Sequence, residues 1–312
     1  MKKTELYIEH NNEMLHVVRW EPCGEVRAVL QIVHGMVEHI ERYAPFAEYL
    51  CSKGVAVVGH DHPGHGRTAA DKESLGFIER KGGDRLLVEC AYRVTEWIRE
   101  SFGGNPNFIL GHSMGSFVVR RYMTEHSGAV CGAVVMGTGT PPVPILSAGR
   151  AMAGAIGKIF GKHHRSPFLK SISFAGYNSR FPKEEGANAW LSSDACEVKK
   201  YDDDPLCGYT FTASAFGVLY DLLYYVARLE NSENIRKDLP VLIVSGEDDP
   251  VGDYGKAPMA LSESLKSLGL SDCECILYSG ARHEILNEKC NSCVREDVLS
   301  WIDKHLIGEE LI

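Results

Sequence analysis

The sequence lacks two features that would limit its partners: a long apolar run and an excess of basic residues. No stretch reaches the about 18 consecutive apolar residues of a membrane span, so no stable membrane insertion is expected. Residues 1–15 contain two lysines but no apolar segment after them, and no signal peptide is predicted. Acidic residues outnumber basic ones by 42 to 33, for a net charge of −9. Because phosphate binding needs a basic surface, nucleic acid is not expected as a partner.

The ten cysteines are the next feature to explain. Without a signal peptide we expect a cytoplasmic protein, in which cysteines remain thiols rather than forming a disulfide framework. Cys273, Cys275, Cys290 and Cys293 could supply four sulfur ligands to zinc. Alternatively, the first pair lies in a strand and the second at the start of a helix, as small buried residues. Since Cys-x-Cys is not a typical zinc-binding pair, no metal is predicted there.

The order of apolar patterns predicts an α/β fold. Residues 4–10 and 13–20 alternate around Asn11-Asn12, which indicates a hairpin. Further along, short apolar runs alternate with helical patterns, which is typical of a mostly parallel sheet with helices on both faces. The strands are expected at 27–35, 55–61, 107–110, 129–137, 239–246 and 274–280. The helices are expected at 42–54, 82–105, 116–126, 256–269 and 292–306.

The alternation stops between about residues 140 and 236. A proline-rich stretch at 141–144 opens this segment, and helical patterns follow at 145–161 and 213–229. We therefore predict a core formed by residues 1–139 and 237–312, and a helical insertion over 140–236 that forms a lid or second lobe. No repeat or low-complexity tract is present, and no feature of the sequence indicates an oligomeric state.

A serine between two glycines is the strongest chemical signal. Gly111-His112-Ser113-Met114-Gly115 follows a strand pattern and precedes a helix pattern. Gly-x-Ser-x-Gly in that context exposes a serine hydroxyl at the carboxyl end of a sheet. Gly111 and Gly115 allow the strained turn and the close approach of strand and helix. The alternative is that Ser113 only caps the helix.

A serine nucleophile needs donors for the oxyanion that forms during acyl transfer. The backbone N–H of Met114 lies at the predicted helix N-terminus. His34-Gly35-Met36 follows the strand at 27–35, so the Met36 N–H is the second candidate. The alternative is that residues 34–36 form an ordinary strand-to-helix turn.

A base and an acid should follow the nucleophile in the order Ser, Asp, His. His283 follows one predicted strand, and Asp248, Asp249 and Asp253 follow another. Both loops leave the carboxyl ends of parallel strands, where such folds place their sites. The residues alone leave the choice among the three aspartates open.

Together these motifs resemble the α/β-hydrolases of the monoacylglycerol lipase and lysophospholipase-like group, which is grouped with the serine aminopeptidase-like hydrolases. The resemblance covers about residues 28–305 and rests on the stretches 34–50, 55–68, 109–116, 241–252 and 280–288. It implies an α/β-hydrolase fold, ester hydrolysis through an acyl-enzyme, no cofactor, and an insertion that caps the cleft.

The resemblance also assigns roles to individual residues. It implies that Ser113 is the nucleophile, His283 the base and Asp249, rather than Asp248, the acid. The oxyanion donors would be the N–H groups of Met36 and Met114.

The sequence departs from the group's usual motifs in two places. Asp-His-Pro-Gly-His-Gly stands where Asp-x-Arg-Gly-His-Gly is usual, so Pro63 replaces a charged residue. His60, His62 and His65 suggest a metal triplet, but the resemblance favours a packed loop without metal. His34-Gly-Met-Val-Glu replaces the His-Gly-Gly-Pro-Gly of related peptidases, which lowers the expectation of aminopeptidase activity.

We therefore predict a hydrolase of monoacylglycerols, lysophospholipids or similar acyl esters, acting on small-molecule substrates. An aminopeptidase or amidase, an acyl thioesterase and a non-enzymatic binding protein remain alternatives. An amine substrate would need a pocket acid, which Glu184, Glu185, Asp194 or Asp202–Asp204 could supply. A long apolar cavity beside Ser113 would favour a lipid ester, whereas a short acidic pocket would favour an amine.

Overall fold

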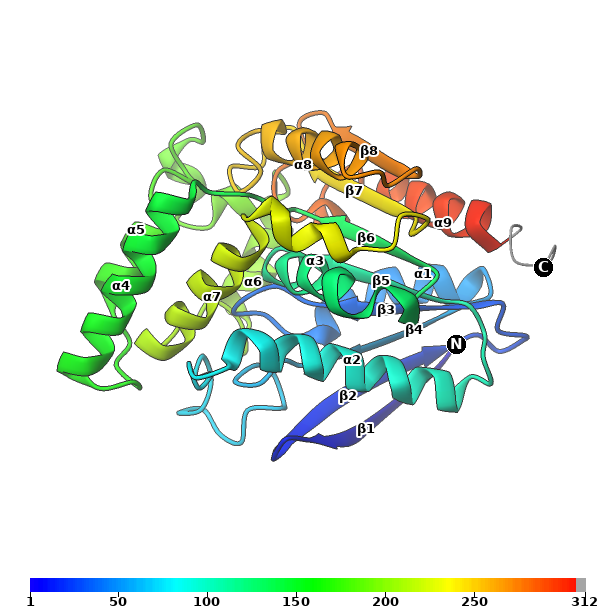
Figure 1. The fold of residues 1–312 in the computed structure, drawn as a ribbon, viewed down its shortest axis with the longest axis horizontal. Coiled ribbons are helices and arrows are strands. Elements are labelled where there is room, and N and C mark those ends of the chain that lie inside the picture. Colours follow the sequence, from blue (N-terminus) through cyan, green and yellow to red (C-terminus); the bar gives the residue numbers. More distant parts are fainter. Residues whose placement is uncertain (307–312) are drawn as a thin grey trace.

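One eight-stranded sheet forms the centre of the computed structural model, which describes residues 1–306 (Figure 1). The strand order is β1-β2-β4-β3-β5-β6-β7-β8. The strands from β4 to β8 along this order pair in parallel, whereas β1, β2 and β4 pair antiparallel. The mostly parallel sheet predicted from the sequence is confirmed. The bounds are β1 (Lys2–His10), β2 (Glu13–Glu21), β3 (Ala28–Val33), β4 (Val55–His60), β5 (Asn107–His112), β6 (Gly132–Met136), β7 (Val241–Gly246) and β8 (Cys273–Tyr278).

Helices cover both faces of the sheet, and neighbouring strand residues point to opposite faces. Ile109 of β5 packs with the helices α2, α3 and α8 on one face, whereas Phe108 and Leu110 pack with α1 and α9 on the other. Strands buried on both faces are apolar throughout, which explains their continuous runs in the sequence. The bounds are η1 (Ile40–Tyr43), α1 (Ala44–Ser52), α2 (Gly83–Ser101), α3 (Met114–His126), η2 (Ser127–Ala129), α8 (Lys256–Ser267), η6 (Ile285–Asn287) and α9 (Asn291–Leu306).

The segment 140–236 leaves the sheet after β6 and returns to it at β7. It contains helices and, throughout this fully described range, no strand. Figure 1 shows α4 and α5 at one end of the molecule, with α7 between them and the sheet. The elements are α4 (Val143–Phe160), α5 (Pro167–Ser173), η3 (Lys183–Glu185), η4 (Ala189–Leu191), α6 (Ala195–Asp203), α7 (Ala213–Val226) and η5 (Leu229–Asn234).

The predicted core segment 237–312 includes residues 307–312, which lie outside the described residues. Among the helices of residues 1–306, none combines the length and the apolarity needed to cross a membrane.

A buried arginine of α3 holds both ends of the insertion. Arg120 donates to the carbonyl of Gly139 at 2.9 Å and to the hydroxyls of Thr138 and Thr140 at 3.3 and 3.2 Å. It also donates to the carbonyl of Val226, the last residue of α7, at 2.9 Å. Burial lowers the pKa of this guanidinium to about 10. Within residues 1–306 it forms no ion pair, so neutral oxygens alone stabilise its charge.

The two candidate metal motifs occupy ordinary structural positions. Cys273 and Cys275 lie in β8, whereas Cys290 and Cys293 lie at the start of α9. The histidines of the Asp-His-Pro-Gly-His-Gly loop are fully buried, and burial lowers the pKa of both His60 and His65 to about 3. The loop is packed, as the resemblance favoured, and the imidazoles of His60 and His65 are neutral.

Asp61 anchors the same loop. Its carboxylate accepts hydrogen bonds from His16 Nδ1 and from the backbone N–H groups of Ile40 and Arg67, each at 2.8 Å. Burial alone would raise the pKa of the Asp61 carboxyl, but the hydrogen bond from His16, the nearby His34 and the two backbone donors together lower it to about 2 from the ordinary 3.8. The ionised form of Asp61 is therefore part of the folded structure.

We predict that Asp61→Asn destabilises the protein at neutral pH by on the order of 2 kcal/mol, the size of the pKa shift. Because the pKa is lowered in the folded state, the stabilisation is complete above about pH 4 and disappears as the pH falls through about 2. Urea unfolding of both proteins between pH 7 and pH 3 measures the difference. Asp238→Asn is the control, since that side chain is 81% exposed. Equal stabilities of Asp61→Asn and wild type at pH 7 would contradict the prediction.

Candidate active site

The candidate nucleophile Ser113 lies on a sharp turn between β5 and α3. Its backbone has φ 52° and ψ −120°, a strained conformation for a residue with a side chain. A Cβ atom on Gly111 would stand 2.2 Å from the carbonyl oxygen of Gly115, and one on Gly115 would stand 2.0 Å from that of Val33. The turn therefore requires both glycines, and it places Ser113 in the lining of a cavity.

The candidate acid and base are in contact. His283 Nδ1 lies 3.0 Å from each carboxylate oxygen of Asp249, and both residues are buried. Asp249 also accepts from the Val251 N–H at 2.9 Å and the Ser245 hydroxyl at 3.3 Å, which fix its orientation. An ionised carboxylate only accepts hydrogen bonds, so Nδ1 carries the proton and Nε2 is the basic nitrogen.

The geometry distinguishes the three aspartates that the sequence left open. Asp248 and Asp253 form no hydrogen bond or ion pair with His283 in the described structure, and the Asp253 side chain is 63% exposed. His283 Nε2 is buried without a hydrogen-bond partner among residues 1–306. His283 and Ser113 line the same cavity. Catalytic hydrogen bonds often form only when substrate is bound, so the free Nε2 is compatible with a role as base toward Ser113.

The two candidate oxyanion donors lie in segments beside the nucleophile. Met114 is the first residue of α3, where a backbone N–H has no partner within the helix. Met36 follows Gly35, and a Cβ atom on Gly35 would stand 3.1 Å from Ser113 Cβ. Both methionines and Ser113 line the cavity. The backbone near Met36 therefore passes directly beside Ser113, as an oxyanion donor must.

The residue after Met36 has a strained backbone that the insertion supports. Val37 has φ 50°, which is rare for a β-branched residue. Its carbonyl accepts hydrogen bonds from the Gly208 N–H at 2.9 Å and the Tyr201 hydroxyl at 3.3 Å. Both donors belong to the insertion, so the insertion helps to fix the loop that carries Met36.

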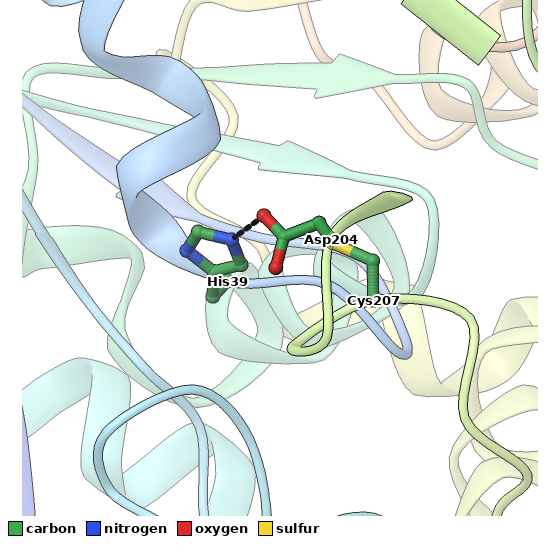
Figure 2. Close-up of side chains that lie close together, drawn as sticks. All are labelled: His39, Asp204 and Cys207. Atoms are coloured by element: carbon green, nitrogen blue, oxygen red, sulfur yellow. Dashed lines mark hydrogen bonds and ion pairs between the residues drawn. The ribbon is translucent and has the colours of Figure 1, made fainter. Parts of the chain in front are cut away.

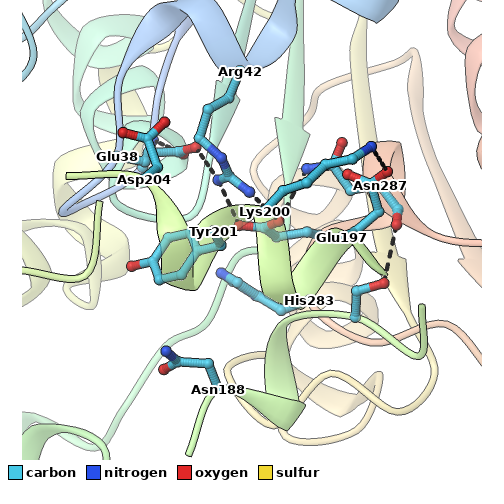
Figure 3. Close-up of polar contacts among 12 residues, drawn as sticks. Glu38, Arg42, Asn188, Glu197, Lys200, Tyr201, Asp204, His283 and Asn287 are labelled. Carbon is cyan, nitrogen blue, oxygen red and sulfur yellow. Dashed lines mark hydrogen bonds and ion pairs between the residues drawn. The ribbon is translucent and has the colours of Figure 1, made fainter. Parts of the chain in front are cut away.

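A buried network of charges joins the loop after β3 to the end of β5 and to the loop after β8 (Figure 3). Arg42 donates to Glu38 at 2.6 Å and to both carboxylate oxygens of Glu284 at 2.7 Å. Glu38 Oε1 accepts from the Gly35 N–H at 2.6 Å and lies 3.4 Å from His112 Nδ1. Burial would raise the pKa of the Glu38 carboxyl, but Arg42 and His112 hold it well below its ordinary value. The network connects the loop that carries Met36 to His112 and Glu284, which are the chain neighbours of Ser113 and His283.

The imidazole of His283 lies between two other rings. The centroid of the His112 ring is 4.8 Å away and that of the Trp190 ring 4.9 Å away, at interplanar angles of 43° and 40°. Trp190 belongs to the insertion, and its backbone carbonyl accepts a hydrogen bond from the backbone N–H of His283 at 3.4 Å. Sequence reasoning missed Trp190, because a single tryptophan in an irregular segment matches no motif.

The cavity has a volume of about 560 Å³ and a largely apolar lining. Within residues 1–306, none of the acids considered for binding an amine lines it: Glu184, Glu185, Asp194 and Asp202–Asp204. Glu38 and Glu284 do line it, but both are paired with Arg42. The apolar side chains of the lining include Leu146, Phe174, Leu219, Leu223 and Phe216.

The chain is similar to known proteins over most of its length. Residues 24–290 match the family model Hydrolase_4, described as serine aminopeptidase, S33. A monoglyceride lipase from Mus musculus is 27% identical over 290 residues, covering 92% of this chain and 86% of the relative. A monoacylglycerol lipase from Mycolicibacterium smegmatis is 27% identical over 294 residues, covering 92% of each.

The fold of this chain is also similar to that of a solved structure over almost its whole length. The thermostable carboxyl esterase from Bacillus coagulans superposes with a TM-score of 0.89 at 27% identity, over 98% of this chain and 99% of that one. The fold class and the family relationship predicted from the sequence are thus confirmed. This chain belongs to the serine aminopeptidase S33 family of α/β-hydrolases.

Proposed function

We propose that this protein hydrolyses carboxylic esters of apolar acyl groups, with monoacylglycerols as its main substrate class. The observation that carries the proposal is the largely apolar cavity that Ser113 and His283 both line. Relatives and a structural neighbour that are named monoglyceride lipase, monoacylglycerol lipase and carboxyl esterase support an ester hydrolase.

In the proposed reaction, Ser113 Oγ attacks the carbonyl carbon of the ester while His283 Nε2 takes its proton. The Met36 and Met114 N–H groups stabilise the oxyanion, and Asp249 stabilises the imidazolium. The intermediate collapses, and His283 returns the proton to the departing alcohol. Water then attacks the acyl-enzyme by the same route, which releases the carboxylic acid and restores Ser113.

The insertion 140–236 acts in this proposal as a cap that supplies most of the acyl-binding wall. Among residues 1–306, the pairing of Glu38 and Glu284 with Arg42 leaves the cavity lining without a free carboxylate for an α-amine, which disfavours an aminopeptidase. A thioesterase would use the same catalytic residues and is distinguished by substrate preference. Lysophospholipids remain in the proposed substrate class, and the cytoplasmic location predicted from the sequence stays a prediction.

We predict that Ser113→Ala lowers kcat for p-nitrophenyl ester hydrolysis at least about 10³-fold, because the nucleophile is lost. The same variant should lose covalent labelling by a fluorophosphonate probe. The control is Ser267→Ala, an exposed position in α8, which should behave as wild type. Labelling that persists in Ser113→Ala would contradict the proposed nucleophile.

A substrate panel tests the reaction class with Ser113→Ala as the blank. We expect a monoacylglycerol to be hydrolysed with a higher kcat/KM than an aminoacyl anilide or an acyl thioester. A preference for the anilide would instead support the peptidase alternative.

We predict that Leu146→Trp shortens the acyl site, since Leu146 is buried in the cavity wall. Each excluded CH₂ group removes about 0.8 kcal/mol of binding, or roughly fourfold in kcat/KM. Hydrolysis of a decanoyl ester should fall at least about tenfold, while an acetyl ester changes by less than about twofold. Ile159→Trp is the control on the same helix, where the side chain is 72% exposed. Equal losses for both esters would contradict an acyl site at Leu146.

We predict that Trp190→Leu lowers kcat about tenfold with little change in KM for a short ester, because the indole packs on His283 and favours its charged form by about 1–2 kcal/mol. Trp190→Phe keeps an aromatic ring and should retain most of the rate. Steady-state kinetics of both variants provide the measurement, and a rise in KM alone would contradict this role.

A further inference from the structure

Three ligand-type side chains meet where the insertion touches the loop after β3 (Figure 2). They are His39, Asp204 and Cys207, and their ligand atoms all lie within 4.8 Å of one another. In residues 1–306 no other group of three histidine, cysteine or acidic side chains meets this criterion. The group lies outside the lining of the cavity that holds Ser113.

The backbone arranges these ligands in advance. Asp204 and Cys207 belong to one turn, in which the Cys207 N–H donates to the Asp204 carbonyl at 3.0 Å. The Leu206 N–H donates to Asp204 Oδ1 at 2.8 Å. The other oxygen, Oδ2, lies 2.8 Å from His39 Nε2. Two ligands thus come from one rigid turn, and the third comes from the loop that leads into η1.

Asp204 supplies the negative charge of the group. Glu38 and Glu284 lie nearby, but Arg42 pairs with both of them, so Asp204 is the carboxylate that faces a bound cation. A cysteine binds zinc as the thiolate, so Cys207 would release its proton when the ion binds. His39 and Cys207 are buried, but the Asp204 side chain is 29% exposed. Asp204 therefore offers a route by which an ion reaches the group.

Nitrogen, sulfur and oxygen ligands of this kind suit zinc, which binds histidine, cysteine and aspartate in tetrahedral sites. We propose that His39, Asp204 and Cys207 bind one Zn²⁺ ion, or a similarly soft divalent cation, and thereby tie the insertion to the oxyanion loop. The fourth position would be taken by water, which the partly exposed side of Asp204 admits.

The segment that carries Asp204 and Cys207 already contacts the loop that carries Met36, and this predicts what a bound ion would do. The turn at 204–207 is flanked by Tyr201 and Gly208, which both donate to the carbonyl of Val37. His39, two residues further along this loop, already contacts Asp204, and a bound ion would replace that contact with bonds to His39, Asp204 and Cys207. The ion should therefore stabilise the folded protein against heat, because it binds only the folded arrangement of the three side chains.

Titration calorimetry of Zn²⁺ into chelator-treated protein tests the proposal, together with thermal unfolding. We expect one ion per chain and a rise of several degrees in Tm under saturating Zn²⁺. Cys207→Ser and His39→Gln should each weaken binding at least about tenfold and remove the rise. Cys196→Ser, an exposed cysteine in α6, should bind as wild type. His283→Gln should also bind as wild type, which separates this site from the catalytic pair.

A second measurement does not depend on the stability of the variants. Co²⁺ bound by a thiolate gives a sulfur-to-metal charge-transfer absorption, which we expect in wild type and not in Cys207→Ser. Binding of Zn²⁺ by Cys207→Ser and His39→Gln with wild-type affinity would overturn the proposal. So would the absence of binding by wild type, or a Co²⁺ spectrum without the sulfur band. The proposed ester hydrolysis would stand in each case, because none of these readouts is activity.

Discussion

The contact of Arg42 with two buried carboxylates is the constraint on which the active site depends. Glu38 and Glu284 both need this cation, and the removal of one partner from a buried ion pair typically costs about 3–5 kcal/mol. Glu38 also accepts the N–H of Gly35 beside the nucleophile, and Glu284 directly follows His283 in the chain. The ion pairs of Arg42 therefore hold the loop that carries Met36 against the segment that carries His283.

The insertion takes part in the same arrangement. Trp190 packs on the ring of His283, and its neighbour Leu191 accepts the N–H of Glu284 at 2.7 Å. At the other side, Arg120 fixes the two ends of the insertion through neutral oxygens. The proposed catalytic residues Ser113, Asp249 and His283 all come from the core, but the groups in contact with them come from both parts of the chain.

The sequence alone was sufficient to predict those features of the fold that are encoded in local residue patterns. Continuous apolar runs revealed the parallel strands, and the glycines around Ser113 revealed the turn. Asp249 needed the resemblance, because three aspartates share its loop and differ only in three-dimensional contacts. Trp190 and Arg120 escaped prediction for a related reason: each acts on a segment far away in the sequence, His283 for the tryptophan and Val226 for the arginine. A contact between distant segments leaves no periodicity in either one.

The strained residue Val37 shows why core and insertion form one catalytic unit. A left-handed β-branched residue costs on the order of 1–3 kcal/mol. The hydrogen bonds that its carbonyl accepts from Gly208 and Tyr201 each contribute about 0.5–1.5 kcal/mol. The two hydrogen bonds together contribute a free energy similar in size to the cost of the strained backbone, so the contacts from the insertion offset that strain. Because Met36 precedes Val37, the same contacts help to fix the backbone N–H that we propose as an oxyanion donor. In that proposal the core supplies the nucleophile, base and acid, and the insertion supports the geometry of the oxyanion site.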